Sequence, residues 1–466
     1  MRSRSRTKPF LLAVLLLLLA VVGSVSYLAW RQSVPGVSVT TPAPRLLGQK
    51  TTVTFGLEAR GGTIARLEVR VAQGGKPSVA LTREALGASR AQVSVIFDGT
   101  ALGLREGSAT IEVRARDDFW RPLRPDDRPI ASYPVTVDLT PPKLEILGAT
   151  QYVSPGGVGL VAFRATGAAR ASVTVGTLVA PSFPSGSPEQ NARVALIALP
   201  YDFTPGTPIA ITAEDEAGNT ASRGIPSELR PRRFPRDTIE IKEAFLQAKV
   251  PELLRKRPPG QPLLDGFLVI NRDQRRQAEA EKRRIGGKTA DRALWEGAFV
   301  QPRNTKVFSN FAETRTYVFG GREIDTQVHF GYDLASTQQA PVPAANRGVV
   351  AFVGALTIYG NTVIVDHGLG LQTLYAHLSR IDVKEGDKVD KGQELGRSGT
   401  TGLAIGDHLH YEVLVHGISV TPLEWWDVKW IRDHIGLPLK QAGLPEIAGL
   451  DGGAATTPPA ARGRGR

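Results

Sequence analysis

The sequence contains no cysteine among its 466 residues and only seven histidines. Without cysteine there are no disulfides, no thiolate metal ligands and no cysteine nucleophile, so a metal would have to be held by His, Asp or Glu. An oxidising compartment is neither required nor excluded. Nucleic-acid motifs are also missing. The formal charge of +12 therefore favours other anionic surroundings, such as phospholipid head groups or acidic polymers, and we expect no nucleic-acid partner.

The N-terminus indicates where most of the chain resides. A basic segment at 1–9 precedes the uncharged run FLLAVLLLLLAVVGSVSYLAW at 10–30, which is long enough to cross a bilayer as a helix. The run is longer than the core of a cleaved signal peptide, and Ser24-Val25-Ser26 is a poor cleavage site. We therefore predict an uncleaved single-pass anchor with a cytoplasmic N-terminus, and the bulk of the chain in the periplasm or cell envelope.

Two β-modules are predicted next. Between 34 and 138, apolar residues alternate with polar ones, as in Val53, Phe55 and Leu57, which is typical of a β-sandwich. A second module, at 139–226, follows a Pro-Pro break and ends in ITAEDEAGNTAS. That segment resembles the last strand and turn of bacterial immunoglobulin-like repeats. Neither module contains a cluster of histidines or paired carboxylates, so we interpret both as spacers or binding modules.

The composition changes near residue 226. Residues 227–295 are rich in Glu, Lys, Gln, Arg and Leu, which predicts a helical connector whose charges form a solvated face. This connector would set the spacing of the final domain and access to it. The period-two pattern returns over 296–430 and predicts a third β-domain. Residues 431–466 end in GGAATTPPAARGRGR and are predicted to be a low-complexity basic tail.

The third domain contains the candidate catalytic and metal-binding residues. In GDHLHYEVLV, His408 and His410 are one residue apart on an expected strand, so their side chains share one face. In VHFGYDLAS, His329 and Asp333 flank Gly331; in an extended segment all three share a face, and the glycine leaves room for a metal. A third segment, YAHLS, supplies His377. The other histidines, at 367, 416 and 434, are interpreted as turn or surface residues.

Together, HFGYD (329–333), the segment 361–402 and GDHLHYEV followed by GISVTPLEWW resemble the lysostaphin and LytM family of zinc endopeptidases. These enzymes cut the peptide cross-bridges of bacterial cell walls. The resemblance implies that His329, Asp333 and His410 bind Zn²⁺ and that His377 and His408 are the catalytic pair. Which of that pair is the general base stays open. It further implies hydrolysis of peptidoglycan cross-link peptides by a zinc-activated water, with a D-alanyl cross-link favoured over a glycine bridge. Glu412 is either an exposed carboxylate or a partner of a metal ligand.

The predicted fold class is mainly β, with a transmembrane helix, two immunoglobulin-like sandwiches, a helical connector and an antiparallel β-sheet metallopeptidase domain. Three alternatives stay open. In the first, the chain is a catalytically silent or autoinhibited LytM-type regulator of other wall hydrolases. In the second, it is a protein whose β-modules hold wall polymer. The third is a periplasmic adaptor, because VKEGDKVDKGQELG resembles a lipoyl-like hammerhead. An adaptor has no need for the five His and Asp residues in this order.

Overall fold

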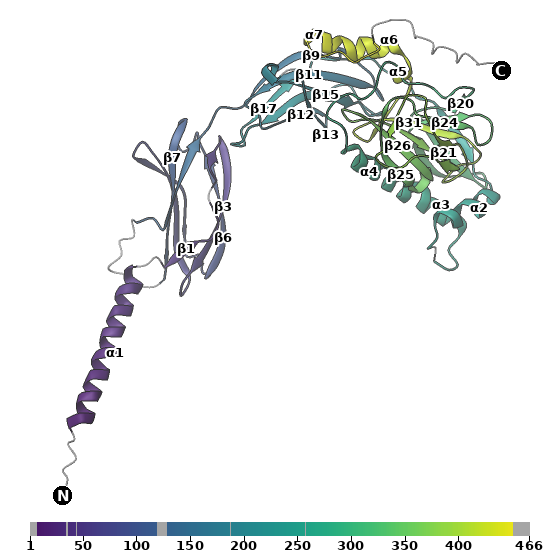
Figure 1. Cartoon of the computed structure of the whole chain (residues 1–466). Helices are drawn as coiled ribbons and strands as arrows, with labels where there is room; N and C mark the ends of the chain where they lie inside the picture. The colour runs from purple at the N-terminus through teal and green to yellow at the C-terminus, as the bar shows by residue number, and fades with distance from the viewer. Residues whose placement is uncertain are drawn as a thin grey trace, which may run out of the picture. The chain divides into compact units, whose positions relative to one another are not determined.

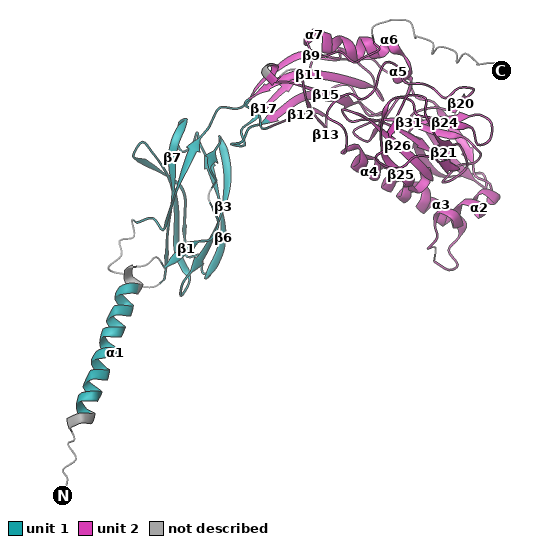
Figure 2. Ribbon diagram, in the orientation of Figure 1, with its two compact units in different colours: residues 1–142, 167–169, 214–220 teal, residues 143–166, 170–213, 221–466 magenta. Residues whose placement is uncertain are grey.

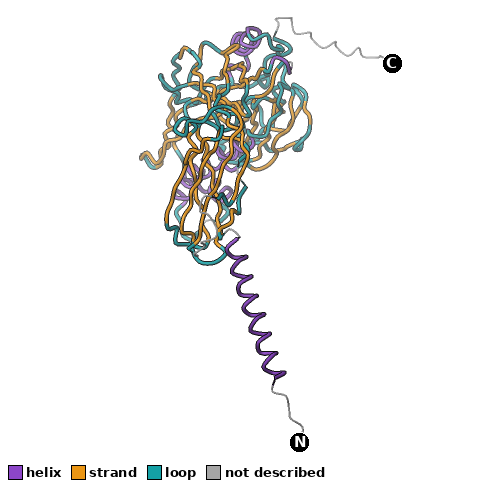
Figure 3. Tube along the Cα trace, turned by 90° about the vertical axis from the view of Figure 1, so that its left-hand side faces the viewer, coloured by secondary structure: helices purple, strands orange, loops and turns teal. Residues whose placement is uncertain are grey.

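The computed structural model describes residues 7–33, 36–42, 44–118, 128–186, 188–256 and 258–450. Strands hold about twice as many of the described residues as helices do, and many strands are visible in the trace in Figure 3. The predicted mainly β class is therefore confirmed. The chain forms two compact units (Figure 2). Residues 1–142, 167–169 and 214–220 make up unit 1, and residues 143–166, 170–213 and 221–466 make up unit 2.

Unit 1 begins with helix α1 (Thr7–Ser33). Its segment Phe10–Trp30 is long and apolar enough to cross a membrane, and its large side chains are exposed. A membrane anchor and a signal sequence both have this length and composition. Most of the predicted cytoplasmic segment before it lies outside the described residues.

The first β-module has two sheets, with strand orders β1–β3–β6 and β2–β8–β7–β4–β5. Its strands are β1 (Val37–Val39), β2 (Leu46–Leu47), β3 (Lys50–Ala59), β4 (Ile64–Gln73), β5 (Lys76–Glu84), β6 (Arg90–Asp98), β7 (Gly107–Asp117) and β8 (Ala131–Val137). The alternating residues of β3 and β4 predicted to face inward, such as Phe55 and Val69, share one buried core with those of β6 and β7. Inward-facing apolar residues from both sheets thus close a sandwich.

The second β-module lies in unit 2 and has two four-stranded sheets, with orders β14–β15–β11–β9 and β13–β12–β16–β17, together with the short pair β10–β18. Its elements are β9 (Lys143–Ala149), β10 (Tyr152–Val153), β11 (Val158–Thr166), β12 (Arg170–Val175), β13 (Leu178–Pro181), β14 (Phe183–Ser185), η1 (Pro188–Gln190), β15 (Ala192–Ala198), β16 (Ile209–Glu214), β17 (Thr220–Gly224) and β18 (Glu228–Leu229).

This second module packs against the C-terminal domain. Strands β11 and β15 are buried along nearly their whole length. One set of their residues, including Leu160 and Leu196, belongs to the same buried core as Tyr332 and Trp425 of the C-terminal domain. One face of its sheet therefore packs against the domain that carries the candidate site, and the interpretation of this module as a spacer or binding module stays a prediction.

The connector contains a strand as well as helices. Its elements are β19 (Arg236–Glu240), α2 (Glu243–Leu253), α3 (Leu263–Val269), the π-helical turn η2 (Ile270–Gln274) and α4 (Arg275–Gly286). Strand β19 pairs in parallel with β21 of the following domain. Buried residues of the helices, such as Phe267 and Ile285, share a core with Ile364 and Leu374 of that domain. The connector is thus packed onto the domain rather than strung between two domains.

The C-terminal domain is built on an eight-stranded sheet in the order β20–β23–β31–β27–β26–β25–β29, with β32 paired to β31. Figure 1 labels four of these strands, β20, β25, β26 and β31. Its elements are β20 (Lys306–Ser309), β21 (Glu313–Phe319), β22 (Arg322–His329), β23 (Tyr332–Ala335), β24 (Pro341–Pro343), β25 (Gly348–Ala355), η3 (Thr357–Tyr359), β26 (Asn361–Gly368), β27 (Leu371–Ala376), β28 (Arg380–Ile381), β29 (Lys388–Val389), β30 (Glu394–Arg397), β31 (Leu409–Val415) and β32 (Ile418–Val420).

Helices follow the last strand of this domain: α5 (Leu423–Trp426), α6 (Val428–Ile431), η4 (Arg432–Gly436) and α7 (Leu437–Gln441). Ile431, Ile435 and Leu439 are buried in the shared core. The predicted start of the tail at 431 is therefore wrong, because this part of the chain is helical and packed. Its apolar residues recur at the spacing of a helix and pack inward. The low-complexity end at 451–466 lies outside the described residues.

Candidate metal centre

The first two candidate ligands stand where the chain passes from one sheet to another. His329 is the last residue of β22 and Asp333 the second of β23. A bend separates them, so the single extended strand expected here is replaced by two strand ends. A Cβ on Gly331 would lie 2.6 Å from the carbonyl oxygen of Tyr411 and 2.7 Å from Nε2 of His410. Glycine is thus required by the close approach of β31 and its histidine ring.

The three predicted ligands converge on one point. Nε2 of His329 lies 3.0 Å from Oδ1 of Asp333 and 3.0 Å from Nδ1 of His410. Nδ1 of His410 lies 2.9 Å from the same carboxylate oxygen. Ligand bonds of 2.0–2.1 Å in a tetrahedral site place ligand atoms about 3.3 Å apart. All three side chains are buried, and the separations therefore fit a small tetrahedral cation such as Zn²⁺.

Hydrogen bonds on the outer side orient each ring. Nδ1 of His329 donates to the carbonyl of Asn310 over 2.9 Å, and Nε2 of His410 donates to Glu412 over 2.9 Å. Each proton is therefore held away from the cluster, and the inward nitrogen keeps its lone pair for a cation. Glu412 is fully buried, so of its two interpretations the partner of a metal ligand is the one that the structure supports.

His377 and His408 complete the wall beside the three ligands. Nε2 of His408 is 3.4 Å from Oδ1 of Asp333, and the ring centroids of His377 and His408 are 4.8 Å apart. Both rings donate from Nδ1 to backbone carbonyls, at Thr401 over 2.8 Å and at Gly406 over 2.7 Å. Their Nε2 atoms are thereby left as proton acceptors.

The backbone of His377 is also unusual. It follows β27 with a φ of +62°, a left-handed conformation that costs a residue with a side chain about 1–3 kcal/mol. Its amide donates to the carbonyl of Tyr359 over 2.9 Å, and this bond helps to hold the conformation. Strain maintained in this way is common where a side chain must be aimed at a site.

Burial and neighbouring groups shift the pKa values of side chains in this cluster. Burial lowers the pKa of His329. Burial together with the neighbouring His408 and His410 holds the pKa of His377 well below its usual range. Burial opposes ionisation of Asp333, yet the surrounding imidazoles hold its pKa well below the usual range. The site therefore presents neutral imidazoles at His329 and His377 beside an ionised carboxylate at neutral pH, as a cationic metal requires.

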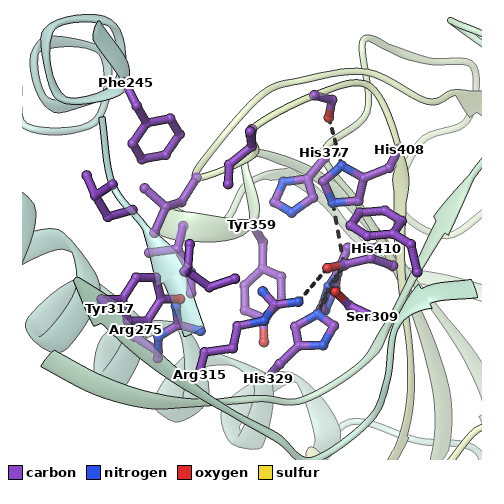
Figure 4. Close-up of a pocket in the computed structure, with 18 of the residues that line it drawn as sticks. Phe245, Arg275, Ser309, Arg315, Tyr317, His329, Tyr359, His377, His408 and His410 are labelled. Carbon is purple, nitrogen blue, oxygen red and sulfur yellow. Dashed lines mark hydrogen bonds and ion pairs between the residues drawn. The ribbon is translucent and has the colours of Figure 1, made fainter. Parts of the chain in front are cut away.

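All five predicted residues line one pocket of about 300 Å³ (Figure 4). The figure shows the four histidine rings gathered on one side, while Phe245 and Tyr317 lie on the other. Connector residues form part of the wall, namely Ile239, Ile241, Phe245, Phe267 and Arg275. The connector thus lines the pocket without filling it. Its apolar contribution was not predicted, because helical charge and periodicity do not show which residues face a distant strand.

Three further polar residues were missed. Arg315, on β21, donates to Oδ2 of Asp333 over 2.8 Å and to Glu313 over 3.1 Å, and so holds the carboxylate oxygen that faces away from the histidines. Tyr359 and Lys282 both bind Glu412, at 2.5 and 2.8 Å. Nothing in their local sequence distinguishes them from ordinary strand or helix residues.

The remaining histidines lie outside the cluster and differ from their predictions. His367, expected in a turn, is a fully buried residue of β26 whose ring binds the carbonyl of Arg347 and the hydroxyl of Thr373. His416 and His434, expected on the surface, are half-buried, and each is bonded to a backbone carbonyl. All three therefore have structural hydrogen bonds.

Part of this chain is similar to known proteins. The model of peptidase family M23 matches residues 327–422. The DD-carboxypeptidase/endopeptidase Mpg of Neisseria meningitidis serogroup B is 43% identical over 97 residues, which cover 21% of this chain and 22% of Mpg. The peptidoglycan DD-endopeptidase ShyA of Vibrio cholerae is 39% identical over 119 residues, 26% of this chain and 27% of ShyA. The chain thus spans about a quarter of these relatives.

Among solved structures, the catalytic domain of lysostaphin from Staphylococcus simulans is 28% identical; the match covers 26% of this chain and 92% of that domain, at a TM-score of 0.24. The sequence matches place a peptidase family M23 domain in this chain, at residues 327–422. The relatives that match this domain are named as a DD-carboxypeptidase/endopeptidase and a peptidoglycan DD-endopeptidase. The immunoglobulin-like character of the β-modules stays a prediction.

Proposed function

We propose that this protein is a zinc-dependent endopeptidase that hydrolyses peptide cross-links of peptidoglycan. The observation that carries the proposal is the convergence of donor atoms from His329, Asp333 and His410, 2.9–3.0 Å apart, in a pocket that also holds His377 and His408. The M23 match and the names of the relatives support the reaction and its substrate.

His329, Asp333 and His410 would hold the zinc ion. When bound, zinc supplies Lewis acidity that lowers the pKa of a water molecule from 15.7 toward about 7. Asp333 would offer Oδ1 to the ion, while Arg315 holds its Oδ2. Arg315 thereby prevents the carboxylate from rotating away from the two imidazoles, and preorganises the ligand set.

His377 and His408 would handle the protons of hydrolysis. The water oxygen bonds to the scissile carbonyl carbon and loses a proton, and cleavage of the C–N bond requires a proton on the leaving amine. A neutral imidazole with a free Nε2 accepts the first proton and can deliver one to the amine. Both rings have that tautomer, so the division of the two steps between them is left to the experiments below.

For the scissile bond we propose a D-alanyl cross-link, in agreement with the DD specificity in the names of Mpg and ShyA. For location we propose that Phe10–Trp30 anchors the chain and that the remainder faces peptidoglycan. Preparations that cleave pentaglycine but leave directly cross-linked muropeptides intact would contradict the proposed bond.

A silent regulator is the second candidate, and the pocket argues against it. Members of such a class need no complete ligand set, whereas all five residues here are oriented by outer hydrogen bonds and border about 300 Å³ of space. Regulation by occlusion of the groove would require the connector to fill this space, and the connector lines it instead.

The test is mass spectrometry of cross-linked muropeptides incubated with the detergent-solubilised full chain, with and without a zinc chelator. We expect cross-linked dimers to disappear, new monomers to appear, and the chelator to abolish both changes. Zinc binding without any cleavage would support the regulator instead, and cleavage that survives complete removal of zinc would exclude the metal-dependent mechanism.

A further inference from the structure

A lysine from the connector lies at the centre of the polar groups behind the metal site. Lys282, on α4, is fully buried. Its ammonium group donates to Glu412 over 2.8 Å, to the hydroxyls of Tyr359 and Ser419 over 3.0 Å each, and pairs with Glu279 at 2.7 Å. A buried ammonium group is costly unless it is paired and hydrogen-bonded in this way. The position of this lysine therefore depends on its polar partners.

Glu412 transmits this contact to the metal site. Its Oε1 accepts from Nε2 of His410 over 2.9 Å and from Tyr359 over 2.5 Å. Its Oε2 accepts from Lys282 over 2.8 Å and from Ser419 over 2.6 Å. Four donors thus saturate one buried carboxylate. This carboxylate in turn determines which nitrogen of the His410 ring carries a proton and which faces the other ligands.

Helix α4 is held in place by its backbone as well as by this lysine. A Cβ on Gly286 would clash with the backbone of His416 and Gly417 at the β31–β32 turn. At the other end of the helix, the hydroxyl of Thr357 donates to the carbonyl of Gln274 over 2.9 Å. The helix therefore lies directly against the hairpin that carries His410, with little freedom to shift.

We propose that α4 is a working part of the metal centre and that Lys282 is a positioning residue, which acts through Glu412 to orient His410 toward the ion. Residues 275–286 lie outside the segment that matches the M23 family at 327–422, so this support comes from the connector and not from the matched segment. The inference rests on the proposed zinc-dependent function, because the effect is exerted on a proposed zinc ligand.

Zinc affinity is the direct measurement, because a purely structural role would not change it selectively. The full chain in detergent is stripped of metal, and zinc is titrated in competition with a chromogenic chelator. We expect Lys282→Met, which keeps the aliphatic stem and removes the charge, to weaken zinc binding about 10-fold. This is the lower end of the effect of removing a group bonded directly to a metal ligand, because Lys282 acts one contact further out, through Glu412. Lys282→Gln, which keeps a neutral donor, gives the same measurement if the methionine variant is not recovered folded.

Ile285→Ala is the matched control. Ile285 is buried on the same helix, three residues further on, and packs in the apolar core without a polar bond to Glu412. We expect this variant to lower the melting temperature and to keep zinc affinity within about twofold of wild type. If it weakens zinc binding as much as Lys282→Met, then α4 acts only through packing and the proposal is wrong.

A double-mutant cycle tests the route of the effect. If Lys282 acts through Glu412, its substitution adds little in a Glu412→Gln background, because coupled residues are not additive. Two outcomes overturn the proposal. In the first, the losses of zinc affinity in the two single variants multiply in the double variant. In the second, Lys282→Met binds zinc as tightly as wild type does. The outcome is separable from that of the proposed function: wild-type protein that binds zinc but cleaves nothing would refute hydrolysis, while the affinity ratios still decide the role of Lys282. Wild-type protein that binds no zinc refutes both.

Discussion

The division of roles between His408 and His410 can be tested by changing one histidine at a time. His410→Ala removes a donor atom that lies 3.0 Å from His329 and 2.9 Å from Asp333. His408→Ala removes a ring whose Nε2 lies 3.4 Å from Oδ1 of Asp333. The first change leaves two donors, whereas the second leaves three. Two neighbouring imidazoles should therefore respond differently in one binding assay.

The expected magnitudes are far apart. Structural sites with four ligands bind zinc with about 10–16 kcal/mol, or about 3 kcal/mol per ligand, so loss of His410 should weaken zinc binding about 10²-fold or more. Loss of His408 should change zinc binding by less than about threefold, because Asp333 keeps its bond to Arg315. It should still reduce kcat by 10²–10⁴, the usual contribution of a proton-transfer group.

The assay combines zinc titration with turnover of a cross-linked muropeptide at saturating zinc. His434→Ala is the control, since His434 binds the carbonyl of Trp430 and is not among the residues that line this pocket. We expect it to match wild type in zinc affinity and in turnover. A His408→Ala protein that loses zinc to the same extent as His410→Ala would refute the assignment. So would one that retains full turnover.

The remaining predictions concern the support of the site and the stability of the fold. Arg315→Met leaves the ligand carboxylate and Glu313 without their cation, and should cost the metal-free protein about 3–5 kcal/mol in urea unfolding, with part of the loss regained on adding zinc; an unchanged midpoint would refute the pairing. Gly331→Ala should weaken zinc binding, because its Cβ would collide with the His410 ring; wild-type zinc affinity would show that the strands can separate at no cost. Burial raises the pKa of Glu424 from 4.5 to about 7, so the folded protein retains a proton that the unfolded chain releases between these values. Stability should therefore fall by about 3 kcal/mol as pH rises from 4.5 to 7, and Glu424→Gln should flatten that part of the curve in urea unfolding at several pH values; an unchanged slope would show that Arg232 keeps the carboxylate ionised.

The candidate site was more predictable from sequence than its support. Two histidines one residue apart, a glycine between a histidine and an aspartate, and a third histidine segment lie within about 80 residues, and short spacings in strands determine which side chains share a face. Lys282 gave no such signal. It lies in EKRR, a run of charges that predicts a solvated face, and its burial depends on a partner 130 residues away.

The packing of the second β-module could be predicted in part from the sequence. VGLVAF and VALIA, in β11 and β15, are nearly continuous apolar runs rather than alternating ones. Such runs indicate a strand that is buried on both faces, and both strands are. The sequence shows that a second face is covered. It does not show by what, because the covering residues, such as Trp425, come from a segment more than 200 positions further along the chain.

The same packing decides between a resident and a displaceable connector. A segment can leave to open the pocket only if other contacts of equal free energy replace those that it loses. Departure of the connector would uncover five large apolar side chains that are now buried, at Leu246, Val250, Phe267, Ile270 and Ile285. At about 1.5–3 kcal/mol each, this exposure costs on the order of 10 kcal/mol, before the loss of the buried cation beside Glu412 is added. Such a cost is comparable to the stability of a whole domain. The connector is therefore better understood as a permanent wall of the pocket, and substrate must enter beside it.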